Sequence, residues 1–212
     1  MLTETVPKPL LPVGGRPFLD YLIDNAMSHG VDDILLLCGY LAPLMIERYA
    51  DNPAVRVVVE SEPAGTAGAL HAARDLLAAE FFLCNGDSFF AIDWRDLAAF
   101  ALTKDVIGAL ALRESAPGRR SGTVELAQDR IGAFHAPEAG RSGPVNAGIY
   151  LLRRAVLDWI GPPPCSLEEQ VFPRLASAGE LAGKLYDGYF IDIGIPDDYG
   201  RAQIDIPALS RR

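Results

Sequence analysis

Short apolar stretches alternate with longer amphipathic ones along this chain. In ILLLC and FFLC every position is apolar, which is typical of strands that helices cover on both faces. Apolar residues at helical spacing predict helices over Pro17–Ser28, Thr66–Ala79 and Asp93–Leu102. The predicted strands are Ile34–Cys38, Val55–Glu60, Phe81–Cys84, Val106–Leu112, Thr123–Leu126, Ala147–Leu152 and Phe190–Ile193.

Two more helices are indicated by their first residues. Ser166 and Glu169 have the spacing of a capping box, in front of a helix that Pro173 must start, kink or interrupt. Asp197 and Asp198 are typical of the first turn of a helix. The alternation of strands and helices from residue 17 to about 103 predicts an α/β fold with a mostly parallel mixed sheet flanked by helices.

The middle of the chain has another character. Residues 113–146 are rich in glycine, proline and serine turns, which predicts a β-rich insertion within one domain rather than a linker between two. At 212 residues the chain can bury a sizeable core without disulfides or metal ions.

Composition and charge exclude several classes of protein. Half of the residues are hydrophobic and 22% are charged, which excludes a disordered chain. The net charge of −9 argues against a general nucleic-acid partner, and no apolar run is long enough for a membrane span. No secretory signal is visible at the start. Three cysteines without CxxC spacing, of which Cys38 and Cys84 stand in apolar runs, predict buried thiols and a cytoplasmic location.

Four segments contain candidate chemistry. In PKPLLPVGGRP, two prolines hold Lys8 on a stiff stretch, where its ammonium suits a phosphate; a solvated lysine is the alternative. In ESEPAGTAGAL, a strand ends and a helix begins. Gly65 and Gly68 would let a flat ligand approach the backbone and the free N–H groups of the helix, although a plain tight connection explains them too.

The other two segments each contribute an aspartate. Asp87 follows an apolar strand directly, where open α/β sheets bind ligands, although Asn-Gly-Asp is also common in turns. Asp192 interrupts an apolar run, and because an unpaired buried carboxylate is costly, we expect a metal or a hydrogen-bond donor beside it. Together, Asp87 and Asp192 would suit one Mg²⁺ that carries phosphates.

Other catalytic classes lack their motifs. The three histidines are isolated and no HExxH is present, and no serine stands in a GxSxG context. A dehydrogenase of the Rossmann type is disfavoured because the sequence has no GxGxxG.

In order along the chain, PKPLLPVGGRPFLDYLI, ESEPAGTAGAL, CNGDSFF, VNAGIYLL, SLEEQVFPRL and YFIDIGIPDDY resemble the sugar-1-phosphate nucleotidylyltransferases. The resemblance covers essentially the whole chain and is strongest to the guanylyltransferases that act on heptose or mannose 1-phosphate. It implies a Rossmann-like nucleotide-diphospho-sugar transferase fold. It also implies Mg²⁺-dependent transfer of a nucleoside monophosphate, with GTP favoured as donor, to a sugar 1-phosphate, releasing pyrophosphate.

The resemblance also implies roles for particular residues. Lys8 matches the family's phosphate-contacting lysine, and Asp87 and Asp192 match its metal-binding pair. The positions at which the family holds the nucleobase match Glu62, Gly65 and Thr66, and those at which it holds the sugar match Asn146, Gly148 and Glu168. Asn85 and Gly86 are also expected to bind substrate. We therefore expect a single domain over 1–212, with a nucleotide-binding part (1–112) and a sugar-binding part (113–212).

Two features depart from the family pattern. The family opens with a β-strand and a GGxGTR loop that binds the phosphates, and neither stands before Leu2 in this chain, so we expect the fold without its first strand. The stretch Ala133–Pro137 lacks the lysine that the family often has there, and His135 or a nearby arginine is the candidate substitute. The alternative function is therefore a catalytically impaired nucleotide-sugar-binding domain. A homo-oligomer is left open.

Overall fold

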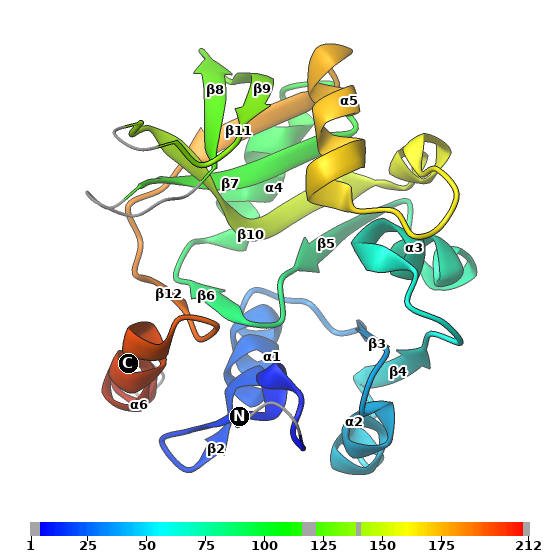
Figure 1. The fold of residues 1–212 in the computed structure, drawn as a ribbon, viewed down its shortest axis with the longest axis vertical. Coiled ribbons are helices and arrows are strands. Elements are labelled where there is room, and N and C mark those ends of the chain that lie inside the picture. The colour runs from blue at the N-terminus through cyan, green and yellow to red at the C-terminus, as the bar shows by residue number, and fades with distance from the viewer. Residues whose placement is uncertain (1–4, 116–121, 139–140, 210–212) are drawn as a thin grey trace. The chain divides into compact units, whose positions relative to one another are not determined.

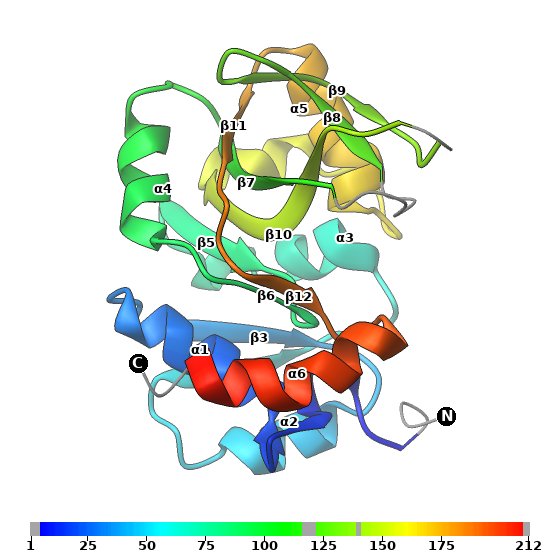
Figure 2. The same cartoon turned by 90° about the vertical axis from the view of Figure 1, so that its left-hand side faces the viewer.

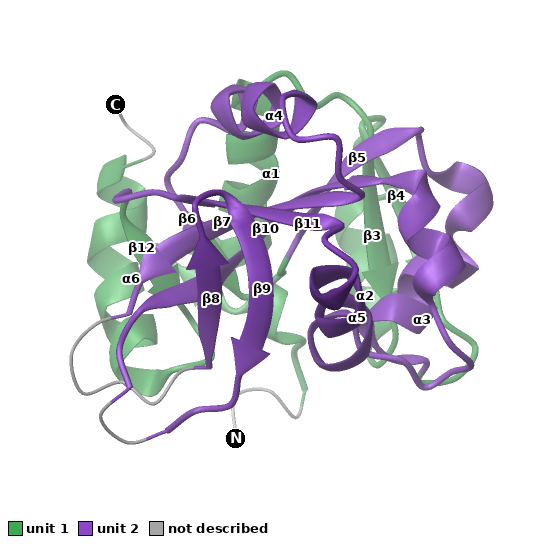
Figure 3. Cartoon of the chain, turned by 90° about the horizontal axis from the view of Figure 1, so that it is seen from above, with its two compact units in different colours: residues 1–63, 85–89, 189–212 green, residues 64–84, 90–188 purple. Residues whose placement is uncertain are grey.

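The computed structural model describes residues 5–115, 122–138 and 141–209 (Figure 1). The chain divides into two compact units, coloured separately in Figure 3. Unit 1 comprises Met1–Pro63, Asn85–Phe89 and Tyr189–Arg212, and unit 2 comprises Ala64–Cys84 and Phe90–Gly188. Each unit therefore takes segments from both sides of residue 112. Residues 116–121 and 139–140 of the predicted insertion lie outside the described residues.

Unit 2 is built on a six-stranded sheet with the order β5-β10-β7-β11-β9-β8. The strands are β5 (Glu80–Cys84), β7 (Gly108–Glu114), β8 (Thr123–Ala127), β9 (Arg130–His135), β10 (Pro144–Arg153) and β11 (Leu181–Leu185). The other elements of this unit are α3 (Gly65–Ala72), η2 (Arg74–Leu76), α4 (Trp94–Leu102), η3 (Arg154–Trp159), the π-helical turn η4 (Leu167–Val171) and α5 (Phe172–Ser177).

The expected fold class, α/β with a mixed sheet flanked by helices, is confirmed, but the expected parallel majority is wrong for this sheet. Only the β7–β11 pair is parallel, and β10 runs antiparallel to both β5 and β7. The hairpin β8–β9 adds a further antiparallel pair at the edge. An apolar strand sequence indicates that both faces of the strand are buried, but it does not indicate whether the neighbouring strands run parallel or antiparallel to it.

Helices α4 and α5 cover opposite faces of this sheet (Figure 2). Leu110 is paired with Tyr150, whose ring packs on Phe172 of α5. The next residue, Ala111, is paired with Lys184, which binds Asp96 of α4. Because consecutive strand residues point to opposite faces, the α5 face carries Tyr150 and the α4 face carries Lys184.

Unit 1 contains the parallel pair β3 (Ile34–Cys38) and β4 (Val55–Val59), in register from Ile34↔Val55 to Cys38↔Val59. Helices α1 (Phe18–Ser28) and α2 (Ala42–Tyr49) supply apolar residues to the core beside these strands. The remaining elements are η1 (Lys8–Leu10), the paired β1 (Pro12–Val13) and β2 (Arg16–Pro17), the paired β6 (Ser88–Phe90) and β12 (Phe190–Asp192), and α6 (Pro196–Leu209).

Most predicted elements are present with ends shifted by a few residues. The helix predicted over Thr66–Ala79 is shorter. α3 ends at Ala72, the N–H of Ala73 donates to the carbonyls of both Ala69 and Leu70, and a 3₁₀ turn follows. Ser166 caps η4 by accepting from the N–H of Glu169 at 3.2 Å, and Pro173 stands in the first turn of α5, which follows η4 directly. Asp197 and Asp198 lie in the first turn of α6, as predicted.

The cysteines follow the expectation only in part. Cys38 and Cys165 are buried. Cys84, the last residue of β5, has solvent-accessible surface, yet protein atoms surround its thiol closely enough that desolvation raises its pKa to about 12. Among the residues that the structure describes, no helix is long and apolar enough to cross a membrane.

Candidate functional site

Unit 1 brings three of the expected catalytic residues together, from three separate segments. Lys8 is the first residue of η1, Asp87 follows β5 in the loop before β6, and Asp192 is the last residue of β12. The N–H of Ile193 donates to the Asp87 carbonyl at 2.9 Å, which joins β12 to this loop. A Cβ added to Gly86 would lie 3.2 Å from Cγ of Pro9, so the segment of Lys8 approaches the same loop closely.

The charged ends of these side chains converge. Nζ of Lys8 lies 3.6 Å from Oδ2 of Asp87. The empty position beside Gly194, where a Cβ would be, lies 3.0 Å from Oδ1 of Asp192, 3.5 Å from Nζ of Lys8 and 3.8 Å from Oδ2 of Asp87. One small volume in unit 1 is therefore lined by two carboxylates and one ammonium group.

The two carboxylates make this volume electronegative. Partial burial raises the pKa of Asp192, and the charge of Asp87 raises it further, while the N–H of Gly194, which donates to Oδ1 at 2.8 Å, opposes the shift. A divalent cation would relieve this repulsion. The described residues contain no group of three or more His, Cys, Asp or Glu side chains with metal-site geometry, but Mg²⁺ commonly takes only one or two carboxylates and completes its shell with waters and phosphate oxygens. The donor set of Asp87 and Asp192 fits that ion.

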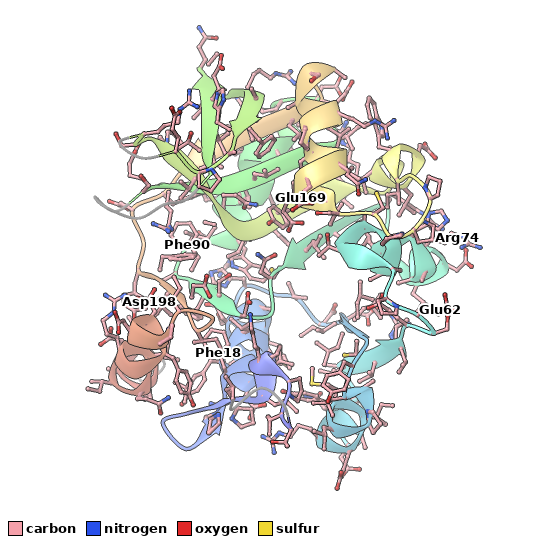
Figure 4. The ribbon with its side chains drawn as sticks, in the orientation of Figure 1. Phe18, Glu62, Arg74, Phe90, Glu169 and Asp198 are labelled. Atoms are coloured by element: carbon pink, nitrogen blue, oxygen red, sulfur yellow. The ribbon has the colours of Figure 1, made fainter. Side chains whose placement is uncertain are left out.

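Unit 1 holds three more of the expected site residues, and two of them adjoin Asp87 in sequence. Asn85 and Gly86 directly precede Asp87 and are half-buried. Glu62 is exposed on the segment that follows β4 (Figure 4). Among the residues that the structure describes, its carboxylate has no hydrogen-bond or ion-pair partner, so it can accept hydrogen bonds from a ligand.

Unit 2 brings a second set of candidates together. The hydroxyl of Thr66 donates to Oε2 of Glu168 at 3.1 Å and accepts from the N–H of Leu167 at 2.8 Å. Glu168 lies in η4, a π-helical turn, and such turns are often found at functional sites. Thr66 therefore holds both the backbone and the side chain of this turn.

Asn146 and Gly148 lie at an irregularity in β10. The pairing of β10 with β7 shifts register between Asn146 and Tyr150, and Gly148 adopts a φ of 77°, which favours glycine. The N–H of Gly148 donates to Oδ1 of Asn146 at 2.9 Å, and Nδ2 of Asn146 donates to the hydroxyl of Tyr150 at 2.8 Å. The bulge therefore fixes the amide of Asn146.

A protein-family profile described as "Nucleotidyl transferase" matches residues 1–208. The chain belongs to the nucleotidyl transferase family. This confirms the resemblance found in the sequence.

Two curated relatives of this nucleotidyl transferase are guanylyltransferases by name. A "Mannose-1-phosphate guanyltransferase" of Schizosaccharomyces pombe is 35% identical over an alignment of 210 residues, which covers 93% of this chain and 58% of the relative. A "D-glycero-alpha-D-manno-heptose 1-phosphate guanylyltransferase" of Aneurinibacillus thermoaerophilus is 31% identical over 211 residues, covering 97% of this chain and 91% of the relative. The chain thus spans little more than half of the mannose-type relative and nearly all of the heptose-type one.

Two solved structures of HddC are similar to this chain in fold and sequence. The crystal structure of HddC from Yersinia pseudotuberculosis matches with a TM-score of 0.83 and 28% identity, over 94% of this chain and 89% of HddC. A second structure of HddC, described as complexed with GMP-PN, matches with a TM-score of 0.81.

Tyr150 of the nucleotidyl transferase adjoins these candidate residues and is not among the residues predicted from the sequence. Tyr150 is fully buried, and its hydroxyl lies between Asn146 and Glu168. Burial raises the pKa of this phenol, and the negative charge of Glu168 raises it further. In the sequence Tyr150 is one more large residue of an apolar strand. The only available signal was that a buried tyrosine hydroxyl needs a hydrogen-bond partner.

The glycines of ESEPAGTAGAL serve the protein's own packing. A Cβ on Gly65 would lie 2.5 Å from the Cys165 carbonyl oxygen, and one on Gly68 would lie 2.6 Å from Cβ of Ala64. The N–H groups of Ala67 and Gly68 both point to the Cys165 carbonyl, at 2.9 and 3.4 Å. The N–H groups of Ala67 and Gly68 are therefore not available to a ligand, and at these two positions the tight connection that the sequence also allowed describes the structure.

His135 does not lie on the α5 face of the sheet. Its Nε2 is 3.4 Å from a carboxylate oxygen of Glu125 on β8, whereas the preceding Phe134 stacks on Phe172 of α5. Because the two residues alternate along β9, His135 points to the other face from Tyr150. This placement disfavours His135 as the substitute for the family's lysine.

Proposed function

We propose that this chain transfers GMP from GTP to a sugar 1-phosphate and so forms a GDP-sugar. A phosphate oxygen of the sugar 1-phosphate bonds to the α-phosphorus of GTP, the bond from that phosphorus to the bridging oxygen breaks, and pyrophosphate leaves with the electron pair. Heptose and mannose 1-phosphates are the favoured acceptors, because the relatives that match most of this chain carry those names. GTP is favoured for the same reason.

The observation that carries the proposal is the convergence of Lys8, Asp87 and Asp192 on one volume of unit 1. Phosphoryl transfer needs positioning and electrostatic stabilisation more than covalent participation by the protein. The ammonium group of Lys8 would bind a phosphate oxygen of the nucleotide as a point charge. Asp87 and Asp192 would hold Mg²⁺, which when bound neutralises the charge that develops on the phosphates.

We assign the nucleobase to Glu62, Gly65 and Thr66, with Asn85 and Gly86 also on the nucleotide side. A carboxylate such as Glu62 is a suitable acceptor for the ring N–H and the amino group of guanine. Gly65 would act through the shape of its loop, since its own Cβ position is filled by Cys165.

We assign the sugar hydroxyls to Asn146 and Glu168. An amide both donates and accepts, and a carboxylate accepts, so this pair can bind several neighbouring hydroxyl groups. The bulge at Gly148 and the hydroxyls of Thr66 and Tyr150 hold these two side chains in place before a ligand binds. Such preorganisation lowers the entropic cost of binding.

The test is release of pyrophosphate from GTP and Mg²⁺ with mannose 1-phosphate or a heptose 1-phosphate, with ATP, UTP and dTTP as nucleotide controls. Formation of a GDP-sugar with one acceptor preferred supports the proposal and identifies the sugar. Absence of pyrophosphate with every nucleotide and sugar would refute it. Binding of GDP-sugar without turnover would instead favour a nucleotide-sugar-binding domain. A cytoplasmic location is expected with this function, and fractionation tests it. The oligomeric state stays open, and gel filtration determines whether the chain forms a homo-oligomer.

A further inference from the structure

Gly194 lies between β12 and α6, two residues after Asp192. Glycine is often needed where the backbone is left-handed, but Gly194 is not among the glycines of positive φ. Gly194 is also exposed. Neither backbone conformation nor burial therefore explains a glycine at this position.

The space beside the Cα of Gly194 explains why a glycine stands at this position. A Cβ on Gly194 would lie within 3.8 Å of charged atoms of Asp192, Lys8 and Asp87, and only 3.0 Å from the nearest of them. By contrast, a Cβ on Gly200, in α6 of the same unit, would meet no atom within 4 Å. Both glycines are exposed and outside the left-handed region, so they differ in what surrounds them.

We propose that Gly194 is a positioning residue for the transfer reaction. Its missing side chain leaves open the volume that a divalent cation and a phosphate oxygen enter, and its N–H orients the Asp192 carboxylate that lines this volume. The inference rests on the proposed function and deepens it, since it assigns a role to a residue that is neither charged nor a side-chain ligand.

Both parts of this role follow from the contacts of Gly194 with the Asp192 carboxylate. The N–H of Gly194 donates to Oδ1 of Asp192 at 2.8 Å, which sets the orientation of this carboxylate. A methyl group 3.0 Å from the same oxygen would compete for the volume where Mg²⁺ must come within about 2.1 Å of its oxygen ligands. Without a cation, the Asp192 side chain can give way by a few tenths of an ångström at little cost. The effect of a methyl group should therefore appear in cation binding and not in folding.

The experiment compares Gly194→Ala with Gly200→Ala in the full chain. Mn²⁺ serves as the probe for Mg²⁺, and its binding is measured by electron paramagnetic resonance with and without GTP. Thermal unfolding in EDTA is measured beside it. We expect Gly194→Ala to weaken Mn²⁺ binding at least tenfold, with an unchanged melting temperature. Gly200→Ala should bind Mn²⁺ as the wild type does and melt at the same or a higher temperature.

The outcomes separate this inference from the function beneath it. Wild-type affinity for Mn²⁺ in Gly194→Ala would overturn the role of Gly194 while leaving the proposed function in place. A large drop in the melting temperature of Gly194→Ala in EDTA would also overturn this role, because the glycine would then be needed for folding. If the wild type itself binds no Mn²⁺ with GTP and releases no pyrophosphate, the proposed function fails, and the inference fails with it.

Discussion

The hydroxyl of Thr66 donates a hydrogen bond to the carboxylate of Glu168 across 102 residues of chain. The two residues come from α3 and from the π-helical turn η4, whose first N–H, that of Leu167, also donates to Thr66. One hydroxyl thus orients a proposed sugar-binding carboxylate and completes the start of the turn that carries it.

Replacing Thr66 by valine should weaken both functions of this hydroxyl. Valine keeps the shape but neither donates to Glu168 nor accepts from Leu167, so we expect a loss of about 1–2 kcal/mol in the free energy of unfolding. The KM for sugar 1-phosphate should rise as well. Urea denaturation and steady-state kinetics measure the two effects. Thr66→Ser is the control, since it keeps the hydroxyl, and a similar loss in that variant would contradict the prediction.

Replacing Tyr150 by phenylalanine should affect the sugar more than the nucleotide. The change removes the acceptor for Nδ2 of Asn146 and the hydroxyl beside Glu168, at a cost of about 1 kcal/mol in stability. We expect the KM for sugar 1-phosphate to rise about tenfold and the KM for GTP to stay within about twofold.

Tyr186→Phe is the matched control for that variant. The Tyr186 hydroxyl donates to Asp96 at 2.7 Å, on the α4 face of the sheet. Its loss should reduce stability by a similar amount and leave both KM values unchanged. If both tyrosine variants raise the KM for the sugar equally, Tyr150 has only a structural role.

Replacing Asp87 or Asp192 by asparagine should remove most of the activity and little of the fold. Each change deletes one negative charge from the proposed Mg²⁺ pair, and we expect kcat to fall by at least about a hundredfold, because the cation acts mainly in the transition state. Asp51→Asn, at an exposed turn of unit 1, is the control and should retain wild-type kcat. Wild-type kcat in either of the other two variants would remove that residue from the metal site.

The pH dependence of stability should distinguish Asp192 from its neighbours. Its pKa is raised in the folded protein, chiefly by burial and by the charge of Asp87, so ionisation of this group destabilises the metal-free fold. The contribution of Asp192 is therefore most favourable below the ordinary value of 3.8 and is lost as the pH rises through the raised folded-state pKa.

We therefore expect Asp192→Asn to melt above the wild type at pH 7 in EDTA, with the difference vanishing in acid. Addition of Mg²⁺ and GTP should raise the melting temperature of the wild type and leave that of the variant nearly unchanged. Thermal unfolding from pH 3 to pH 8 measures both. A wild type that melts above Asp192→Asn at pH 7 without metal would contradict the expected destabilisation by the ionised carboxylate.

The sequence predicted local structure well where local physics decides it. Ile34–Cys38 is apolar throughout and forms β3 over the predicted residues, and the amphipathic stripe of Pro17–Ser28 forms α1. Ser166 caps a turn because its side chain and the nearby backbone suffice for that bond. The direction of β10 could not be predicted in this way, since strand neighbours depend on the path of the whole chain.

For the candidate site, the sequence alone determined the residue types and the family: a lysine held between prolines, an aspartate after a strand and a second aspartate inside an apolar run. Only the tertiary structure decided which of them meet, placing Lys8, Asp87 and Asp192 around Gly194 and linking Thr66 to Glu168. The tertiary structure also revealed Tyr150 and filled the space beside Gly65 and Gly68 with the protein's own atoms. The physical reason is one of range: hydrophobic periodicity and capping act over a few residues, whereas convergence of charges and the filling of space join residues that are far apart in the chain.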